Sequence, residues 1–244
     1  MQISFFEEFP NKENLAKLKL LPFPTKLYLG AHSLKEFENI KISSSVKEKI
    51  YWPLLKKEEG YWFSPFSKRL AVERILKEIE GKDIPVMIDA ELPTHPQPLL
   101  YLTEFPSFFI TRDYIRSFVA KQKKVYTAEY FPSSKVMESI FFFLGLSFKP
   151  KNHYPIKMVY SSMHDFGEEK TKGILSSAKK RYGRRLRVGL GTMGVGIRGD
   201  EPSLSKEMLE RDLQMCKSVG IEEIIIFRLG GLKKEYLPIL EKFL

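Results

Sequence analysis

Two carboxylates stand at the end of a short apolar run in the segment VMIDAELP, residues 86–93. Asp89 and Glu91 are two residues apart, and residues at i and i+2 of a β-strand point to the same side. Pro93 then ends the run, because proline cannot donate a hydrogen bond to a strand ladder. Two crowded acids suit general acid–base chemistry, since the charge of one raises the pKa of the other and keeps it protonated.

Polar residues also end other apolar runs of the chain, namely Glu8, Glu129, His164 and Arg228. Several acids that meet at one place suit the cleavage of glycosidic bonds. There one acid protonates the leaving oxygen, and a second group stabilises the developing positive charge. We therefore expect Asp89, Glu91 and Glu129 to be catalytic, and Glu8, His164 and Arg228 to contact the substrate.

Aromatic residues crowd the same strand ends. The segment YWP…GYWFSPF places Trp52 and Trp62 in one loop region, where their rings could stack on sugar faces. Tyr160 follows another apolar run. The sequence thus predicts a small-molecule or oligosaccharide substrate, with no cofactor and no metal required.

Strands that alternate with helices must position these groups. The expected strands cover residues 3–9, 26–31, 49–55, 86–92, 124–131, 156–163, 186–192 and 223–229. The expected helices cover residues 11–20, 33–39, 68–80, 107–122, 134–144, 168–181, 203–219 and 233–243. Eight such pairs in about 250 residues match a (β/α)8 TIM barrel, in which active sites lie at the carboxyl ends of the strands.

A doubly wound open sheet uses the same alternation. The number of pairs, with a strand first and a helix last, favours a closed barrel. No linker rich in proline, glycine or serine divides the chain, so we expect residues 1–244 to form a single (β/α)8 barrel domain.

Composition excludes several classes of protein. The net charge is +10, but lysines alternate with glutamates over the expected helices, which is typical of solvated faces and does not favour nucleic acid as a partner. Cys216 is the single cysteine, so no disulfide within the chain is expected. No signal peptide and no apolar run long enough to cross a membrane is evident, which predicts a cytoplasmic protein. Oligomeric state is not indicated.

The segment DAELP, residues 89–93, resembles the end of strand four in chitinase-like glycoside hydrolases of family 18, whose signature closes with D-x-E and a proline. KMVYSSM, residues 157–163, is similar to the M-x-Y-D element of strand six. The resemblance implies that Glu91 is the general acid, that Asp89 orients an N-acetyl group, and that Tyr160 positions the substrate. The family's strand-six aspartate is Ser161 here, which leaves Glu129 as an alternative second carboxylate.

Other readings of the same residues stay open. Glu91, Glu129, His164 and Asp165 could bind Mg²⁺ or Mn²⁺ in a metal-dependent barrel like a sugar isomerase or a phosphoesterase. GLGTMG, residues 189–194, is followed by a loop rather than a helix, so a phosphate site shared with Gly230 and Gly231 is more plausible there than a dinucleotide site. A barrel that binds a ligand without catalysis is the third reading.

Overall fold

The structure is a computed structural model that describes residues 1–93, 97–132, 134–149, 153–163 and 167–244. The chain divides into two compact units. Unit 1 comprises Met1–Leu29, Ile40–Lys49 and Ile156–Leu244, and unit 2 comprises Gly30–Asn39 and Ile50–Pro155. Three of the four boundaries fall inside strands, and the fourth follows α2 at Asn39; a single domain over residues 1–244 stays a prediction.

The strands follow one another in the order β1 to β8 and close into a barrel, and every register observed between neighbours is parallel. Their bounds are β1 Gln2–Glu7, β2 Thr25–Ala31, β3 Val46–Pro53, β4 Val86–Ala90, β5 Val125–Tyr130, β6 His153–Val159, β7 Arg187–Gly191 and β8 Glu223–Phe227. The predicted (β/α)8 TIM barrel is confirmed. In β6 the strand ends at Val159, so Tyr160 lies just after the strand and not within it.

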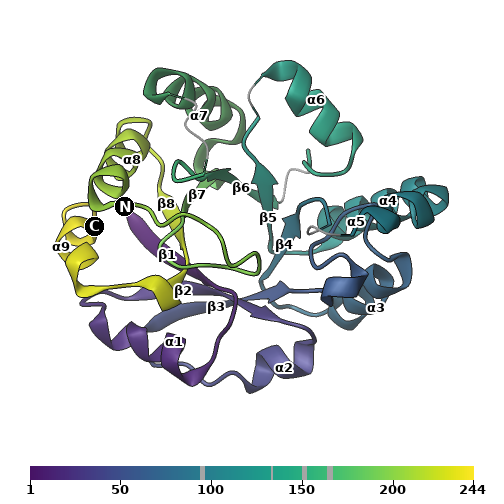
Figure 1. The fold of residues 1–244 in the computed structure, drawn as a ribbon, viewed down its shortest axis with the longest axis horizontal. Helices are drawn as coiled ribbons and strands as arrows, with labels where there is room; N and C mark the ends of the chain where they lie inside the picture. The colour runs from purple at the N-terminus through teal and green to yellow at the C-terminus, as the bar shows by residue number, and fades with distance from the viewer. Residues whose placement is uncertain (94–96, 133, 150–152, 164–166) are drawn as a thin grey trace. The chain divides into compact units, whose positions relative to one another are not determined.

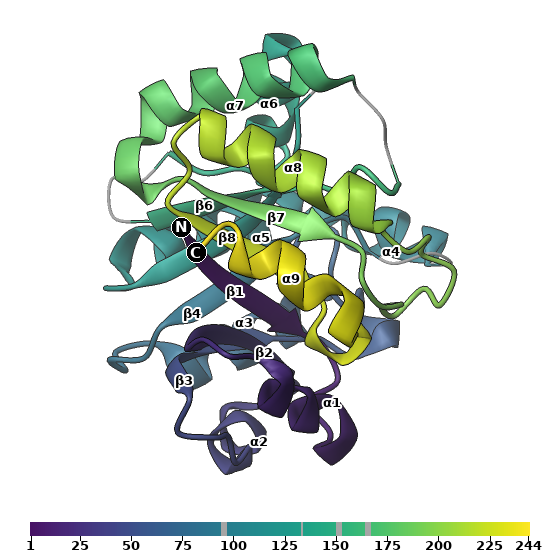
Figure 2. The same cartoon turned by 90° about the vertical axis from the view of Figure 1, so that its left-hand side faces the viewer.

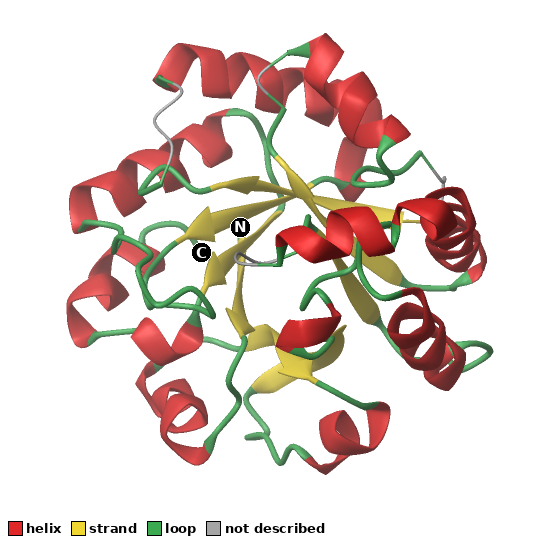
Figure 3. Cartoon of the chain, turned by 45° about the vertical axis from the view of Figure 1, so that its right-hand side comes forward, coloured by secondary structure: helices red, strands yellow, loops and turns green. Residues whose placement is uncertain are grey.

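Helices alternate with the strands along the chain (Figure 3). The α-helices are α1 Lys12–Ala16, α2 Leu34–Asn39, α3 Arg69–Ile79, α4 Pro98–Thr103, α5 Phe108–Lys121, α6 Lys135–Phe143, α7 Glu168–Tyr182, α8 Lys206–Ser218 and α9 Leu237–Glu241. Short 3-10 helices are η1 Lys17–Leu20, η2 Lys57–Glu59, η3 Phe105–Ser107, η4 Gly183–Arg185, η5 Leu229–Gly231 and η6 Lys234–Tyr236. Among the α-helices of the described residues, α4 is the one that the sequence patterns did not predict.

Periodic apolar residues explain the long helices. In α3 the buried residues are Ala71, Val72, Ile75, Leu76 and Ile79, at the three- and four-residue spacing of one helix face. Figure 1 shows α3 and α5 side by side in unit 2, where they are in contact. Ser205 begins α8 by accepting a hydrogen bond from the Met208 N–H at 3.1 Å, which satisfies one of the donors left open at a helix start.

In unit 1, β7, β8 and β1 run alongside one another, and α8 and α9 are neighbours on one side of them (Figure 2). The opposite, concave side is the barrel interior. Phe6 of β1 reaches across β8 to within 3.6 Å of the place where a Cβ on Gly189 of β7 would lie. Phe6 also contacts the rings of Tyr28 and Phe227 from the neighbouring strands.

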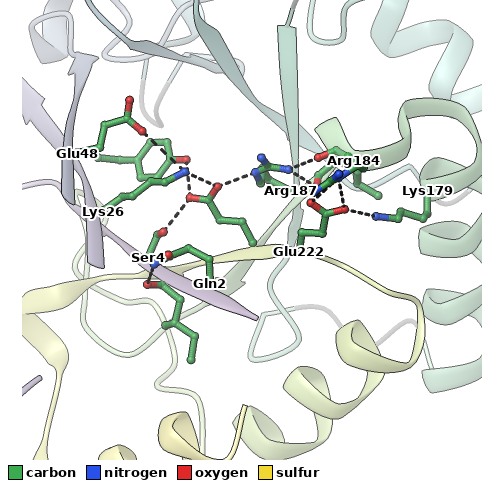
Figure 4. Close-up of polar contacts among 12 residues, drawn as sticks. Gln2, Ser4, Lys26, Glu48, Lys179, Arg184, Arg187 and Glu222 are labelled. Atoms are coloured by element: carbon green, nitrogen blue, oxygen red, sulfur yellow. Dashed lines mark hydrogen bonds and ion pairs between the residues drawn. The ribbon is translucent and has the colours of Figure 1, made fainter. Parts of the chain in front are cut away.

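A buried ion network occupies the amino-terminal end of this interior face (Figure 4). The Glu223 carboxylate accepts from Lys26 Nζ at 2.8 Å and from Arg187 Nε at 2.7 Å. Its other oxygen accepts from the hydroxyls of Ser4 at 2.8 Å and Tyr28 at 3.3 Å. Burial by itself raises the pKa of Glu223, but Lys26, Arg187 and Ser4 outweigh burial, so this pKa lies below its ordinary value.

The basic segment 179–187 is held by carboxylates. Lys179 and Arg184 both lie against Glu222, with Arg184 Nε 3.1 Å from Glu222 Oε1, and Arg187 pairs with Glu223 (Figure 4). Lys179 is in the last turn of α7, where cations are favoured by the helix dipole. These three cations therefore have structural partners. In the part of the chain that the structure describes, no helix is long and apolar enough to span a membrane.

Candidate functional site

The register of β3 and β4 decides where Asp89 points. The ring of Phe37 from α2 stacks on Tyr51 of β3 at 4.9 Å between centroids, so Tyr51 faces the helices. Val86 of β4 is opposite Tyr51 and shares that face. Alternation then puts Ala90 toward the helices and Asp89 toward the barrel interior, as the sequence predicts.

Asp89 and Glu91 share their surroundings with Tyr130, the last residue of β5. Asp89 has an exposed fraction of 6%, and Glu91 is half-buried just beyond the strand. The Leu92 N–H donates a hydrogen bond to the Tyr130 hydroxyl oxygen at 3.2 Å. Because this oxygen accepts from the backbone, the phenol can donate its own hydrogen toward a neighbouring acceptor.

The pKa of Tyr130 reports on the two acids beside it. Burial raises this pKa well above its usual range, and the negative charges of Glu91 and then Asp89 raise it further. Both carboxylates therefore act on the phenol, and Tyr130 stays neutral at any physiological pH. A hydroxyl held in this way by the backbone is suited to donating a hydrogen bond to a substrate oxygen.

The loop between β3 and α3 is fastened to β4 at Asp89. The Phe63 N–H donates to the Asp89 carbonyl at 2.9 Å, and the neighbouring Trp62 is half-buried. Gly60 makes the turn with a φ of 112°, which favours glycine, and a Cβ there would lie 2.8 Å from Ser67 Oγ. The structure thus positions Trp62 one residue from a direct contact with the strand that carries the acids.

Glu129 is a correction to the predicted catalytic set. Ala90 is opposite Glu129 in the β4–β5 register, and Asp89 is opposite Ala128. Glu129 therefore lies on the helix-facing side, and Asp89 on the interior side. Glu129 is fully buried, accepts from Thr127 Oγ1 at 2.7 Å, and lies 3.7 Å from His153 Nε2. Its place in the register therefore separates Glu129 from Asp89, which faces the interior.

Trp52 is also differently placed from the expectation. It lies on β3 with an exposed fraction of 2%, which leaves no ring face on which a sugar could stack. Trp62 keeps part of its side chain exposed and contacts the Tyr61 ring edge-on at 5.7 Å. Of the two tryptophans, Trp62 is the one able to contact a substrate.

In unit 1, Glu8 and Tyr160 both lie around the ring of Phe227. The Tyr160 and Phe227 centroids are 6.1 Å apart. A Cβ on Gly191 would lie 3.1 Å from the Tyr160 ring, so the ring packs tightly against β7 at this glycine. A Cβ on Gly196 would lie 2.8 Å from both Glu8 Oε2 and the Phe227 ring. The loop after β7 therefore rests directly on Glu8.

The guanidinium of Arg228 is engaged by other residues of unit 1. It donates to Glu7 at 3.0 Å and to the Val195 carbonyl at 2.7 Å, and it lies over the Phe9 ring at 4.9 Å. Glu7 is fully buried, and burial raises its pKa despite the opposing effect of Arg228. Arg228 thus fixes the loops at the ends of β1, β7 and β8, and its predicted contact with substrate stays a prediction.

Several backbone donors after β7 and β8 are already engaged within unit 1. The Gly230 N–H donates to Glu7 Oε2 at 2.6 Å, and the Gly231 N–H donates to the Arg228 carbonyl at 3.0 Å. The Met193 N–H donates to the Phe227 carbonyl at 2.6 Å. These donors are engaged within unit 1, so the phosphate reading of this loop is wrong for these three groups.

The predicted metal ligands can be assessed only in part. His164 and Asp165 lie outside the described residues. Among the residues that are described, no group of three or more His, Cys, Asp or Glu side chains is arranged to hold a metal ion. Within the paired strands β4 and β5, Asp89 and Glu129 point to opposite faces.

No protein-family model matches the sequence, and no curated protein is similar to it. Solved structures do match. A family 18 chitinase from Pseudoalteromonas aurantia is similar over 100% of both chains, with a TM-score of 0.54 and 8% identity. The PgaB (BpsB) glycoside hydrolase domain from Bordetella bronchiseptica covers 93% of each chain, with a TM-score of 0.52 and 12% identity.

A D-tagatose 3-epimerase-like protein is similar to the same degree, with a TM-score of 0.55, 14% identity, and coverage of 100% of this chain and 97% of its own. Identities this low establish the fold alone. The chain has the TIM-barrel fold that glycoside hydrolases share with other enzymes of sugar chemistry, and the family 18 motifs themselves stay a prediction.

Proposed function

We propose that the protein is a glycoside hydrolase-like enzyme that cleaves a carbohydrate by general acid catalysis, with Glu91 as the acid. The observation that carries the proposal is the hydrogen bond from the Leu92 N–H to the Tyr130 hydroxyl, which holds this phenol at the end of β4, where Asp89 and Glu91 lie. A likeness of fold to glycoside hydrolases supports it.

In the proposed reaction the carboxyl of Glu91 donates its proton to the glycosidic oxygen, and the bond from that oxygen to the anomeric carbon breaks. A water molecule then adds to the anomeric carbon, and the proton that it releases restores the acid form of Glu91. Asp89 remains ionised and stabilises the positive charge that develops on the sugar ring. Its charge also favours the protonated form of Glu91 before the reaction. Tyr130 donates a hydrogen bond to a substrate oxygen, and Trp62 offers a partly exposed ring beside the acids.

The role of Asp89 follows from what replaces the family's strand-six aspartate. Ser161 stands at that position, and its hydroxyl donates to the buried Asp212 of α8. We therefore assign Asp89 to charge stabilisation, without requiring that the substrate carry an N-acetyl group. The substrate-positioning roles of Tyr160 and Glu8 stay predictions.

The test is kinetic. Glu91→Gln should lower kcat on glycosides with poor leaving groups by about 10²–10⁴-fold, the usual contribution of general acid assistance. Activated aryl glycosides, which leave without protonation, should lose much less. Glu58→Gln is the matched control, because Glu58 is an exposed acid on the loop before α3. Tyr130→Phe should lower activity on both substrate classes, since it removes a donor that does not depend on the leaving group.

Two outcomes would contradict the proposal. Equal losses on both leaving-group classes for Glu91→Gln, together with a loss of bound Mg²⁺ or Mn²⁺, would favour the metal-dependent reading. Full activity of Glu91→Gln, or no hydrolysis of any glycoside by the parent protein, would leave a barrel that binds a ligand without cleaving it.

A further inference from the structure

The imidazole of His32 lies at the carboxyl end of a strand in unit 2. His32 follows Ala31, the last residue of β2, and its side chain is exposed. The His32 N–H donates to Glu36 Oε2 of α2 at 2.8 Å, which holds the backbone at this position. Active sites of (β/α)8 barrels are built from residues at these strand ends. His32 is therefore placed to contact a substrate, although the proposed reaction does not use it.

The tautomer of this imidazole follows from the hydrogen bond that it makes. His32 Nδ1 lies 3.2 Å from the Leu54 carbonyl oxygen, and a carbonyl oxygen can only accept. Nδ1 therefore carries the hydrogen, and in the neutral ring Nε2 keeps its lone pair. Within the part of the chain that the structure describes, no group donates to Nε2. An exposed acceptor is thus available to a bound molecule.

The support of the imidazole is buried backbone. The Leu54 N–H donates to the Ala31 carbonyl at 2.9 Å, so two hydrogen bonds join the end of β2 to the residue that follows β3. Leu54 and Leu55 have exposed fractions of 3% and 0%. A side chain that is already fixed loses little freedom when it binds a ligand, and this preorganisation favours binding.

The loop that begins at Leu54 is also bonded to the strand that carries the acids. The Phe63 N–H donates to the Asp89 carbonyl at 2.9 Å. The preceding residue, Trp62, is fixed through its carbonyl, which accepts from the fully buried Ser67 hydroxyl at 2.6 Å. One loop therefore supports both the imidazole and the Trp62 ring, and it is bonded to β4 at Asp89.

The spacing of the strands determines which part of a substrate the imidazole can reach. β3 lies between β2 and β4, and neighbouring strands are about 4.8 Å apart, so the ends of β2 and β4 are separated by about 10 Å. His32 is therefore too far from Glu91 to contact the same glycosidic oxygen. It is close enough to contact the next sugar unit, whose hydroxyl groups are donors for an acceptor such as Nε2.

We propose that His32 is a substrate-binding residue, whose Nε2 accepts a hydrogen bond from a hydroxyl of the sugar unit next to the scissile bond. The substrate is then an oligosaccharide and not a simple monoglycoside. This inference rests on the proposed function, because that function places the scissile bond at Glu91. A contact one sugar unit away from the reacting atoms contributes to binding, so His32 acts on KM and not on kcat.

Two variants separate this binding role from a structural one. His32→Asn can keep a side-chain N–H near the position of Nδ1, and with it the bond to Leu54, but it removes the acceptor at Nε2. His32→Gln can place its amide oxygen near the position of Nε2. On an oligosaccharide, His32→Asn should raise KM by about 2–12-fold, the usual effect of one neutral hydrogen bond, with kcat little changed. His32→Gln should restore most of the parental KM.

Two controls accompany these variants. An aryl monoglycoside lacks the neighbouring sugar unit, so its KM should be the same for His32→Asn and the parent. Lys35→Gln is the matched control variant, because Lys35 is an exposed residue of α2 close to His32 in the chain, and it should keep the parental KM on every substrate.

A chemical measurement tests the same contact without hydrolysis. Diethylpyrocarbonate modifies accessible, unprotonated imidazole nitrogens, and peptide mass spectrometry measures the modification of His32. Cellotetraose, maltotetraose and chitotetraose are the probes, and at least one of them should protect His32 in the parent and in Glu91→Gln. Protection without any hydrolysis by the parent would contradict the proposed function and leave the His32 contact standing. The inference is overturned if none of the three protects His32, or if His32→Asn keeps the parental KM, which would leave the imidazole a purely structural role.

Discussion

Replacing Glu223 with glutamine removes the one negative charge that lies between Lys26 and Arg187 at the amino-terminal end of the barrel interior. The carboxylate is 97% buried by side-chain area, since 3% is exposed, and Arg187 is 11% exposed. A glutamine amide can still offer one oxygen to the two cations, but it no longer neutralises them. Breaking a buried ion pair by removing one partner costs about 3–5 kcal/mol.

The lower end of that range applies here. The side chain of Lys26 is 20% exposed, and its Nζ lies 3.8 Å from Glu48 Oε2. In the variant, part of the Lys26 charge therefore stays compensated by Glu48 and by solvent. Arg187 also donates to the carbonyls of Arg184 and Leu186. We therefore expect Glu223→Gln to lower the free energy of unfolding by about 3 kcal/mol, which corresponds to a Tm lower by roughly 6–12 °C in a chain of this size.

The effect should depend on pH. The folded-state pKa of Glu223 lies below its model-compound value of 4.5, so its stabilising contribution is complete above that value and is lost as pH falls through the folded-state pKa. The stability difference between the parent and Glu223→Gln should therefore be constant from pH 6 to pH 8 and shrink below pH 4.5. Urea unfolding at a series of pH values measures this difference directly.

Glu222 provides the control. It precedes Glu223 and also pairs with cations, but its side chain is 40% exposed. Exposed ion pairs are worth about 0–1 kcal/mol, so Glu222→Gln should change stability by less than about 1 kcal/mol. The reasoning fails if the two variants are equally stable, or if the Glu223→Gln difference persists undiminished at pH 3.

Further predictions concern a glycine pair and a helix cap. Gly196→Ala should lower the free energy of unfolding by about 1–3 kcal/mol, because its Cβ would lie 2.8 Å from Glu8 and Phe227, and it should reduce activity in the same assay as Glu91→Gln. In α7, a Cβ on Gly173 meets nothing within 4 Å, so Gly173→Ala should raise the free energy of unfolding by about 0.5–1 kcal/mol. Ser205→Ala should cost about 1 kcal/mol in thermal unfolding by removing the α8 cap, and Ser205→Asp should restore it; no loss in the alanine variant would contradict the assigned cap.

The alternation of apolar runs predicts the barrel because each strand is buried and each long helix has a single apolar face. β8, EIIIF, is buried at all five positions, and α3 buries residues at helical spacing. Helix α4 does not have such a buried apolar face. It is six residues long, and Leu99 and Leu102 are exposed while only Leu100 is buried, so its apolar residues mark a surface and not a core face.

The site is less predictable because the residues of a strand do not by themselves show which of its two faces points into the barrel. VYTAEYF alternates equally well with Glu129 inside or with Tyr130 inside. Only the pairing of Asp89 with Ala128 fixes the choice, and it puts Tyr130 beside the acids and Glu129 among Thr127 and His153. Arg228 is a similar case, since nothing local to it indicates that Glu7, more than two hundred residues earlier, would be its partner.

The exchange of Glu129 for Tyr130 changes which chemistry the acids can perform. A second acid beside Glu91 would increase the negative charge at the end of β4 and favour a divalent cation there. A phenol that burial and both carboxylates keep neutral adds no charge and supplies a hydrogen-bond donor instead. The barrel fold is common to hydrolases and epimerases of sugars, so the fold does not separate these classes. The proposed function rests instead on Tyr130 and the two acids, and the Glu91→Gln assay with its metal analysis decides between proton transfer to a sugar oxygen and the coordination of a metal.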